Sequence, residues 1–377
     1  MIYMFLDKWF ANNKRSFFIT LAFLVLSAIL IITMFWRNSI TIKIDQLALF
    51  ENPSAAAKEV DIAKKGTRLS IVNEKHGWYQ LRREDNEETG WVPSWIVNDQ
   101  DKFQDKKVTR LSQATIVLDA GHGGSDPGSI AVVGRDKDPD YQEKTYTLKM
   151  INAIKRELEK TGARVILTRT DDTFINIHQI PELAIKNSAD AFISVHFDST
   201  EPQAPIKKPK SSSSQNSSTS QIEGALQSAD IAPADDAVTS EATEEQESES
   251  SDSSNSSEIS SEEEEEEYIP VIPASGFETF YYHDNGSREL SDALCDALDG
   301  IGLSNRGSNE AEYVVIKENS RPATLLELGF INNGSDFELI QSDKFRNDVA
   351  KKIRKGLTNY FDNVAPKLNY SAVQNSK

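Results

Sequence analysis

Two histidines and two glutamates lie at the ends of short apolar runs, and this pattern constrains the fold more than any other feature. Runs of four to eight aliphatic residues bounded by glycine or polar residues are typical of buried strands. In chain order, the four are His122 after residues 116–120, Glu143 at the start of a helical stretch, His196 after 191–195, and Glu327 within 324–330. In parallel α/β sheets ligands bind beyond the carboxyl ends of the strands, so we expect the four side chains to meet there.

The residue types at these four positions indicate metal-assisted hydrolysis. Two histidines and one carboxylate that leave a fourth position open are a common catalytic zinc arrangement. A further glutamate nearby can act as the general base. A carboxylate inside the apolar run that contains Glu327 is costly unless it meets a metal, a partner or a substrate, so we interpret Glu327 as functional.

Strand-like and helix-like patterns alternate through residues 114–199 and 276–362. Strands are predicted at 114–119, 165–167, 191–195, 277–282, 313–316 and 324–328, and helices at 144–160, 287–298 and 336–360. This alternation implies parallel βαβ units, so we predict an α/β fold for this part of the chain.

Residues 40–98 carry a different pattern, with short alternating segments separated by turn residues. Strands are predicted at 40–44, 68–72, 78–82 and 90–93, with turns at 65–66 and 76–77. The Lys-Gly-Thr, Gly-Trp-Tyr and Gly-Trp-Val motifs of this region resemble the bacterial SH3-like (SH3b) domain, which implies a small all-β barrel that holds wall material. For its Trp78, Tyr79, Trp91 and Trp95 we favour core packing over ligand contact.

The N-terminus contains 20 consecutive residues without charge, 17–36. As a helix they would extend roughly 30 Å, the thickness of the hydrocarbon core of a bilayer. Lys8, Lys14 and Arg15 precede the segment and favour a cytoplasmic N-terminus at 1–16, with the rest of the chain outside. A cleaved signal peptide is the alternative, but the apolar run is too long and no small-residue cleavage motif follows it.

The formal charge of −18 comes almost entirely from one segment. Residues 211–267 hold 17 acidic residues, 18 serines and no lysine or arginine, whereas the rest of the chain has 41 basic and 42 acidic residues. The near-neutral remainder argues against binding of nucleic acid. Such a composition cannot bury enough apolar surface to fold, so we predict that residues 201–275 are a disordered insertion within the α/β domain. We interpret the insertion as a solvated spacer, with an electrostatic gate beside the site as the alternative.

Several further motifs surround the four candidate residues. They occupy residues 116–128, 143–144, 192–196, 276–282, 305–307 and 322–333. Together they resemble the zinc-dependent N-acetylmuramoyl-L-alanine amidases of the amidase-3 family over residues 114–362. The resemblance implies that His122, Glu143 and His196 bind Zn²⁺, that Glu327 is the catalytic glutamate, and that a six-stranded, mainly parallel sheet flanked by helices acts on peptidoglycan. Arg306, in the 305–307 motif, is a candidate for binding substrate carboxylates or for fixing a loop.

We therefore interpret the chain as a membrane-anchored hydrolase that faces the cell wall. It would cleave the amide bond between N-acetylmuramic acid and L-alanine in wall remodelling or daughter-cell separation. A zinc peptidase acting on stem peptides and a non-enzymatic wall-binding scaffold are the alternatives, and the sequence leaves open a regulatory or divisome protein partner. The predicted parts are a cytoplasmic segment 1–16, a transmembrane helix 17–36, an SH3b-like domain 40–98, a linker 99–113, the catalytic domain 114–362 and a flexible tail 363–377.

Overall fold

The computed structural model describes residues 15–16, 18–30, 38–85, 87–104, 106–200, 206–207, 268–269, 273–283 and 285–368. The chain divides into two units, of which one comprises 1–200 with 274–377 and the other comprises 201–273. In the second unit the described strands are two residues long each and pair antiparallel, β10 (Ile206–Lys207) with β11 (Tyr268–Ile269). The remainder of the predicted disordered insertion, up to residue 272, lies outside the described residues, as do 369–377 of the predicted tail.

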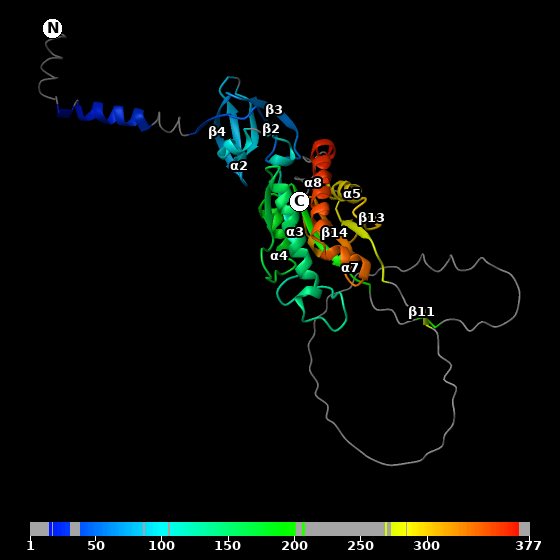
Figure 1. Cartoon of the computed structure of the whole chain (residues 1–377). Helices are drawn as coiled ribbons and strands as arrows, with labels where there is room; N and C mark the ends of the chain where they lie inside the picture. The colour runs from blue at the N-terminus through cyan, green and yellow to red at the C-terminus, as the bar shows by residue number, and fades with distance from the viewer. Residues whose placement is uncertain are drawn as a thin grey trace, which may run out of the picture. The chain divides into compact units, whose positions relative to one another are not determined.

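The first part of the larger unit is all-β, as predicted. Its elements are β1 (Ser39–Thr41), β2 (Gln46–Phe50), β3 (Glu59–Lys64), β4 (Arg68–Lys75), β5 (Trp78–Arg83), β6 (Thr89–Pro93) and a short helix, α2 (Ser94–Asn98). The six strands pair antiparallel in the order β1-β4-β5-β6-β2-β3. In Figure 1, β2, β3, β4 and α2 of this region are labelled and drawn in blue to cyan. The predictions missed β2 and β3. Positive φ angles at His76 and Gly77 form the turn between β4 and β5.

The α/β part is built on a second six-stranded sheet, of order β13-β12-β14-β9-β7-β8. Its strands are β7 (Thr115–Ala120), β8 (Arg164–Leu167), β9 (Ala191–Asp198), β12 (Phe277–Tyr281), β13 (Asn305–Glu310) and β14 (Ala323–Phe330). Its helices are α3 (Glu143–Glu159), α4 (Gln179–Lys186), α5 (Ser287–Leu298), α6 (Val314–Lys317), α7 (Gly334–Gln341) and α8 (Asp343–Asn359).

The sheet is mainly parallel, as expected, but it contains one antiparallel pair, so not all of its units are the parallel βαβ units that the alternation of strands and helices predicted. Strands β12 and β14 are antiparallel, while the other neighbours in the sheet are parallel. The reason lies at the insertion, whose two ends meet, because the Ala274 amide donates to Thr200 Oγ1 at 3.0 Å. The chain leaves the sheet after the carboxyl end of β9 and re-enters it at the same end, so β12 must run opposite to β9.

Two local predictions for the second half of the chain were wrong, and one strand was missed. The strand predicted at 313–316 is the helix α6. The edge strand β13 was missed because it is polar and none of its residues is buried. The helix predicted at 336–360 is two helices, α7 and α8. They separate at Ser342, whose side chain accepts from the Phe345 amide and caps α8.

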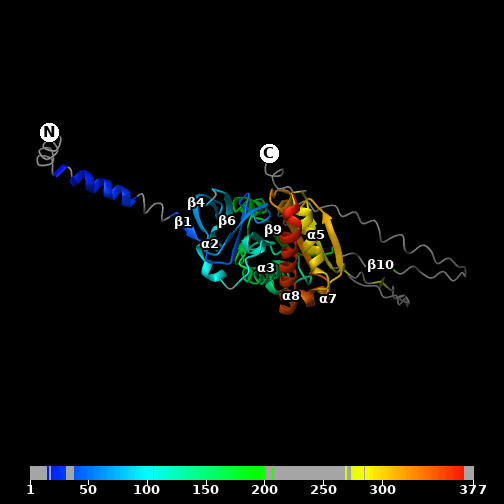
Figure 2. The ribbon, with the colours of Figure 1, turned by 90° about the horizontal axis from the view of Figure 1, so that it is seen from above.

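Residues alternate between two buried faces of the sheet. Ile116, Leu118, Ile193, Val195, Leu326 and Leu328 pack in one core with α3, α5 and α8. Val117, Phe192 and Leu325 pack on the other side with α4 and α6. Helix α8 lies between α3 and α5 over the first face (Figure 2). Strands covered on both faces read as continuous apolar runs, which is why the sequence revealed β7, β9 and β14.

The N-terminal apolar segment is helical over residues 18–30, and its large side chains are exposed. Residues 17 and 31–36 of the predicted transmembrane helix lie outside the described residues. Across the parts of the chain that the structure describes, no helix combines the length and the apolar character needed to cross a bilayer.

Candidate metal centre

The loop after β7 brings His122 back over the end of the sheet. His122 has φ of 63°, and Gly123 and Gly124 also have positive φ, so the backbone turns sharply here. The glycine before the histidine is needed for space. A Cβ at Gly121 would lie 2.2 Å from Cε1 of His196, so a side chain at this position would displace the second histidine.

Glu143, the first residue of α3, joins the two histidines. Its Oε2 lies 3.1 Å from Nε2 of His122, and its Oε1 lies 3.0 Å from Nδ1 of His196. The two imidazole rings are 4.9 Å apart and nearly perpendicular. One ligand atom from each of the three residues lies within 4.8 Å of the others. The structure thus brings together three of the four predicted residues in an arrangement that can hold a metal ion.

Neighbouring groups fix the orientation of these side chains. Asp126 Oδ2 lies 2.7 Å from Nδ1 of His122, which leaves Nε2 facing Glu143. The Glu143 carboxylate accepts from the backbone amides of Ser129 at 2.9 Å and Phe197 at 3.0 Å. A carboxylate behind a ligating histidine is a recurrent way to orient the ring. Sequence reasoning gave Asp126 no role, although it stands four residues after His122 in the same loop.

The cluster has strongly coupled charges. Burial lowers the pKa of His122, but the charges of Glu143 and Asp126 outweigh burial and raise the pKa to about 11. Burial raises the pKa of Glu143, and here the two histidines outweigh it and lower the pKa. The site therefore stabilises positive charge between its ligands, and a divalent cation supplies that charge without a proton.

Glu327 completes the group from β14. It pairs with His196 across the parallel ladder, and it is only 8% exposed. Its Oε2 is buried and has no hydrogen-bond partner among the described residues. Burial, followed by the charges of Glu143 and Asp198, raises the pKa of Glu327 well above its usual value. A buried carboxylate oxygen without a partner beside three potential ligands fits a site completed by a metal and its water.

A second buried carboxylate, which the sequence analysis missed, lies beside Glu327. Glu278 on β12 is directly opposite Glu327 in the antiparallel ladder and is 7% exposed. Arg306 on β13 donates from Nε to Glu278 at 3.3 Å, and its guanidinium lies over the ring of Phe330. The predicted substrate residue Arg306 is thereby held beside Glu278, the ladder partner of Glu327, while its side chain stays 35% exposed.

Arg169 is a further buried residue that sequence reasoning overlooked. Its guanidinium donates to the backbone oxygens of Ala120 and Gly121, both at 3.0 Å. These contacts tie the end of β7 and the start of the loop that carries His122 to the segment that follows β8. By contrast, His178 is exposed and pairs with Glu318, so the structure leaves it outside the cluster.

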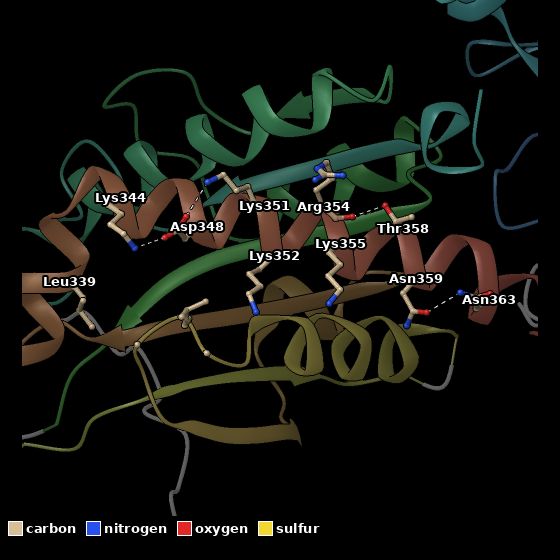
Figure 3. Close-up of a pocket in the computed structure, with 13 residues that line it drawn as sticks. Leu339, Lys344, Asp348, Lys351, Lys352, Arg354, Lys355, Thr358, Asn359 and Asn363 are labelled. Atoms are coloured by element: carbon tan, nitrogen blue, oxygen red, sulfur yellow. Dashed lines mark hydrogen bonds and ion pairs between the residues drawn. The ribbon is translucent and has the colours of Figure 1, made fainter. Parts of the chain in front are cut away.

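A separate surface groove of about 860 Å³ runs along α8 (Figure 3). Its basic lining residues are Lys344, Lys351, Lys352, Arg354 and Lys355. Asp348 pairs with both Lys344 and Lys351, and Arg354 pairs with Glu157 of α3. None of the four candidate site residues lines the groove, so it is distinct from the metal centre.

Comparison with known proteins gives the family. The model of the N-acetylmuramoyl-L-alanine amidase family matches residues 116–228 and 266–359, and that of the bacterial SH3 domain matches 45–98. The chain is 29% identical over 363 residues to the probable cell wall amidase LytH of Staphylococcus aureus, covering 94% of this chain and 97% of that protein.

Among solved structures, it is similar to an N-acetylmuramoyl-L-alanine amidase of Clostridium difficile 630, at 22% identity and a TM-score of 0.46, over 66% of this chain and 97% of that one. The catalytic domain of CwlV from Bacillus (Paenibacillus) polymyxa var. colistinus matches at 24% identity and a TM-score of 0.44, over 66% and 98%. Because the family match spans more than half of its length, the chain belongs to the N-acetylmuramoyl-L-alanine amidases.

Proposed function

We propose that this peptidoglycan amidase uses a zinc ion held by His122, Glu143 and His196, with Glu327 as its catalytic glutamate. The observation that carries the proposal is the buried Oε2 of Glu327, which has no hydrogen-bond partner in the described parts of the chain. It lies beside three potential ligands whose ligand atoms are within 4.8 Å of one another. Two imidazoles and one carboxylate suit zinc and leave room for water and substrate.

The chemistry follows from these positions. When bound, zinc would supply a Lewis acid for the scissile carbonyl and lower the pKa of an attacking water. Glu327, whose Oε2 is buried beside the three potential ligands, would accept the proton of that water. It then gives the proton to the amine of L-alanine as the bond to the lactyl carbonyl of N-acetylmuramic acid breaks.

Arg306 is proposed to hold a carboxylate of the stem peptide. Glu278 accepts a hydrogen bond from Nε of Arg306, which orients the guanidinium. The packing of the guanidinium over Phe330 limits the motion of the side chain. A guanidinium presents paired donors that match a carboxylate. In this arrangement Glu278 is a positioning residue that acts through Arg306.

The N-terminal segment is proposed to anchor the enzyme in the cytoplasmic membrane, with the amidase facing the wall. The uncharged run 17–36 and the exposed apolar side chains of its described helical residues support this. A regulatory or cell-division protein is a proposed partner, and peptidoglycan is the substrate.

The test is digestion of purified peptidoglycan by the full chain in a mild detergent, with and without a zinc chelator. We expect release of peptides with a new amino group on L-alanine, identified by mass spectrometry, and loss of release with chelator. New termini inside the stem peptide would instead establish a zinc peptidase. No release together with no bound zinc would favour a wall-binding scaffold and refute the proposal.

A further inference from the structure

One buried carboxylate of the amidase part is satisfied by the SH3-like region. Asp190 immediately precedes β9 and is 1% exposed. It accepts hydrogen bonds from Ser54 Oγ at 2.6 Å and the Ala55 amide at 3.0 Å, both in the loop between β2 and β3, and from the Thr115 amide at 2.8 Å. Removing the loop would leave a buried acid without two of its donors, which is costly.

Most of the aromatic side chains of the SH3-like region take part in the same junction. Residues 38–98 contain five aromatic residues, namely Phe50, Trp78, Tyr79, Trp91 and Trp95. Phe50, Trp78 and Trp91 belong to the core that contains the α/β sheet, and Trp95 packs against it. Trp78 makes edge contacts with both Phe50 and Trp95. The rings of Phe50, Trp78 and Trp91 are thus buried inside the protein and are not available to stack on sugars or peptides.

Polar contacts close the rim of the junction. Trp95 Nε1 donates to the carbonyl of Gly162 at 3.2 Å, just before β8. Arg110 donates to the carbonyls of Ala55 and Ala57 at 3.0 and 2.9 Å, and its guanidinium lies over Phe50. The junction therefore combines an apolar centre with satisfied polar groups, as a domain core does.

The junction lies at the opposite end of the sheet from the metal centre. Thr115, Gly162 and Asp190 stand at or before the first residues of β7, β8 and β9, whereas His122 follows the end of β7. Six strand residues separate the two ends of β7, or about 20 Å at the usual rise per residue.

We propose that the SH3-like region, residues 39–98, is a fixed part of the amidase body that directs the metal centre away from the N-terminal segment. It acts as a rigid spacer, and its Trp78 face does not bind the wall. The directional consequence rests on the proposed membrane anchor, whereas the rigid junction stands on the contacts alone.

The test is calorimetric unfolding of the full chain in detergent, combined with hydrogen exchange of peptides from β4 and β14. We expect one transition shared by both sheets. Trp78→Ala should lower that single Tm by about 5–15 °C and increase exchange in both strands. The matched control is Arg83→Ala, which removes the partly exposed pairs with Asp61 and Asp85 far from the junction contacts and should lower Tm by less than about 3 °C.

Two outcomes would overturn the proposal. Separate transitions of the wild-type chain would show that the SH3-like region is an independent module. Loss of protection in β4 of Trp78→Ala, with β14 unchanged, would show the same. Neither measurement uses substrate or turnover, so the proposed amidase chemistry can fail while the rigid junction holds, and the reverse is equally detectable.

Discussion

Glu327 lies directly opposite His196 in the parallel ladder between β14 and β9. Paired residues of neighbouring strands project from the same face of a sheet, so the candidate general base and a candidate metal ligand are placed side by side by backbone hydrogen bonds. Their relative position is therefore set by the sheet and not by a mobile loop, which suits a group that must meet a reacting water.

Glu327→Gln should strongly reduce turnover and keep the metal. The amide has nearly the same shape but cannot accept the water proton, so we expect kcat to fall by about 10²–10⁴-fold. Zinc content, measured by elemental analysis, should match the wild type. Glu318→Gln, a change of an exposed carboxylate, is the control. Turnover close to wild type in Glu327→Gln would refute the assignment.

Asp126→Asn should weaken zinc binding without removing a ligand. The carboxylate orients His122 through Nδ1, and loss of such a partner typically costs about 10–100-fold in affinity. Competition with a chromogenic chelator measures the change. Asp136→Asn, in the same loop but exposed, should bind zinc as the wild type does. Equal zinc affinities of Asp126→Asn and Asp136→Asn would show that Asp126 does not contribute to the metal centre.

Arg306→Ala should raise KM more than it lowers kcat. A charge-assisted pair to a substrate carboxylate is worth about 1.5–3 kcal/mol, so we expect roughly 10–100-fold in kcat/KM. Arg288→Ala, on the exposed face of α5, is the matched control. Glu278→Gln should reproduce part of the KM effect, because it loosens Arg306. A pure kcat effect in Arg306→Ala would contradict a binding role.

The stability of the metal-free and zinc-loaded proteins should diverge as pH rises. In the metal-free protein the pKa of His122 is raised to about 11. The positive charge of His122 therefore stabilises the fold fully below the ordinary pKa of a histidine, and this stabilisation is lost as the pH rises toward 11. The pKa of Glu143 is lowered, so the contribution of its charge to stability is fully present above the ordinary pKa of a glutamate and is lost as the pH falls. Zinc needs deprotonated ligands, so its stabilisation grows with pH.

Thermal melts at pH 6, 7, 8 and 9, with zinc or with chelator, check this expectation. The difference in Tm should widen with pH in the wild type and be absent in His122→Ala. A difference that narrows as pH rises would argue against these ligands.

Local pattern was sufficient to locate the centre of the fold. The apolar runs before His122, before His196 and around Glu327 predicted β7, β9 and β14, because strands buried on both faces must be apolar throughout. Since parallel strands end at one edge, the same runs placed three of the candidate residues together. The helix beginning at Glu143 followed equally from its 3.6-residue periodicity.

The tertiary structure alone decided the features that depend on distant pairing. The direction of β12 follows from the meeting of Thr200 with Ala274, and the pairing of Glu278 with Glu327 follows from that direction. The polar strand β13 carries no apolar signal of its own. The junction of Ser54 with Asp190 joins residues 136 positions apart. Each of these features depends on which distant surfaces pack together. That packing is a property of the whole fold, and no short window of residues encodes it.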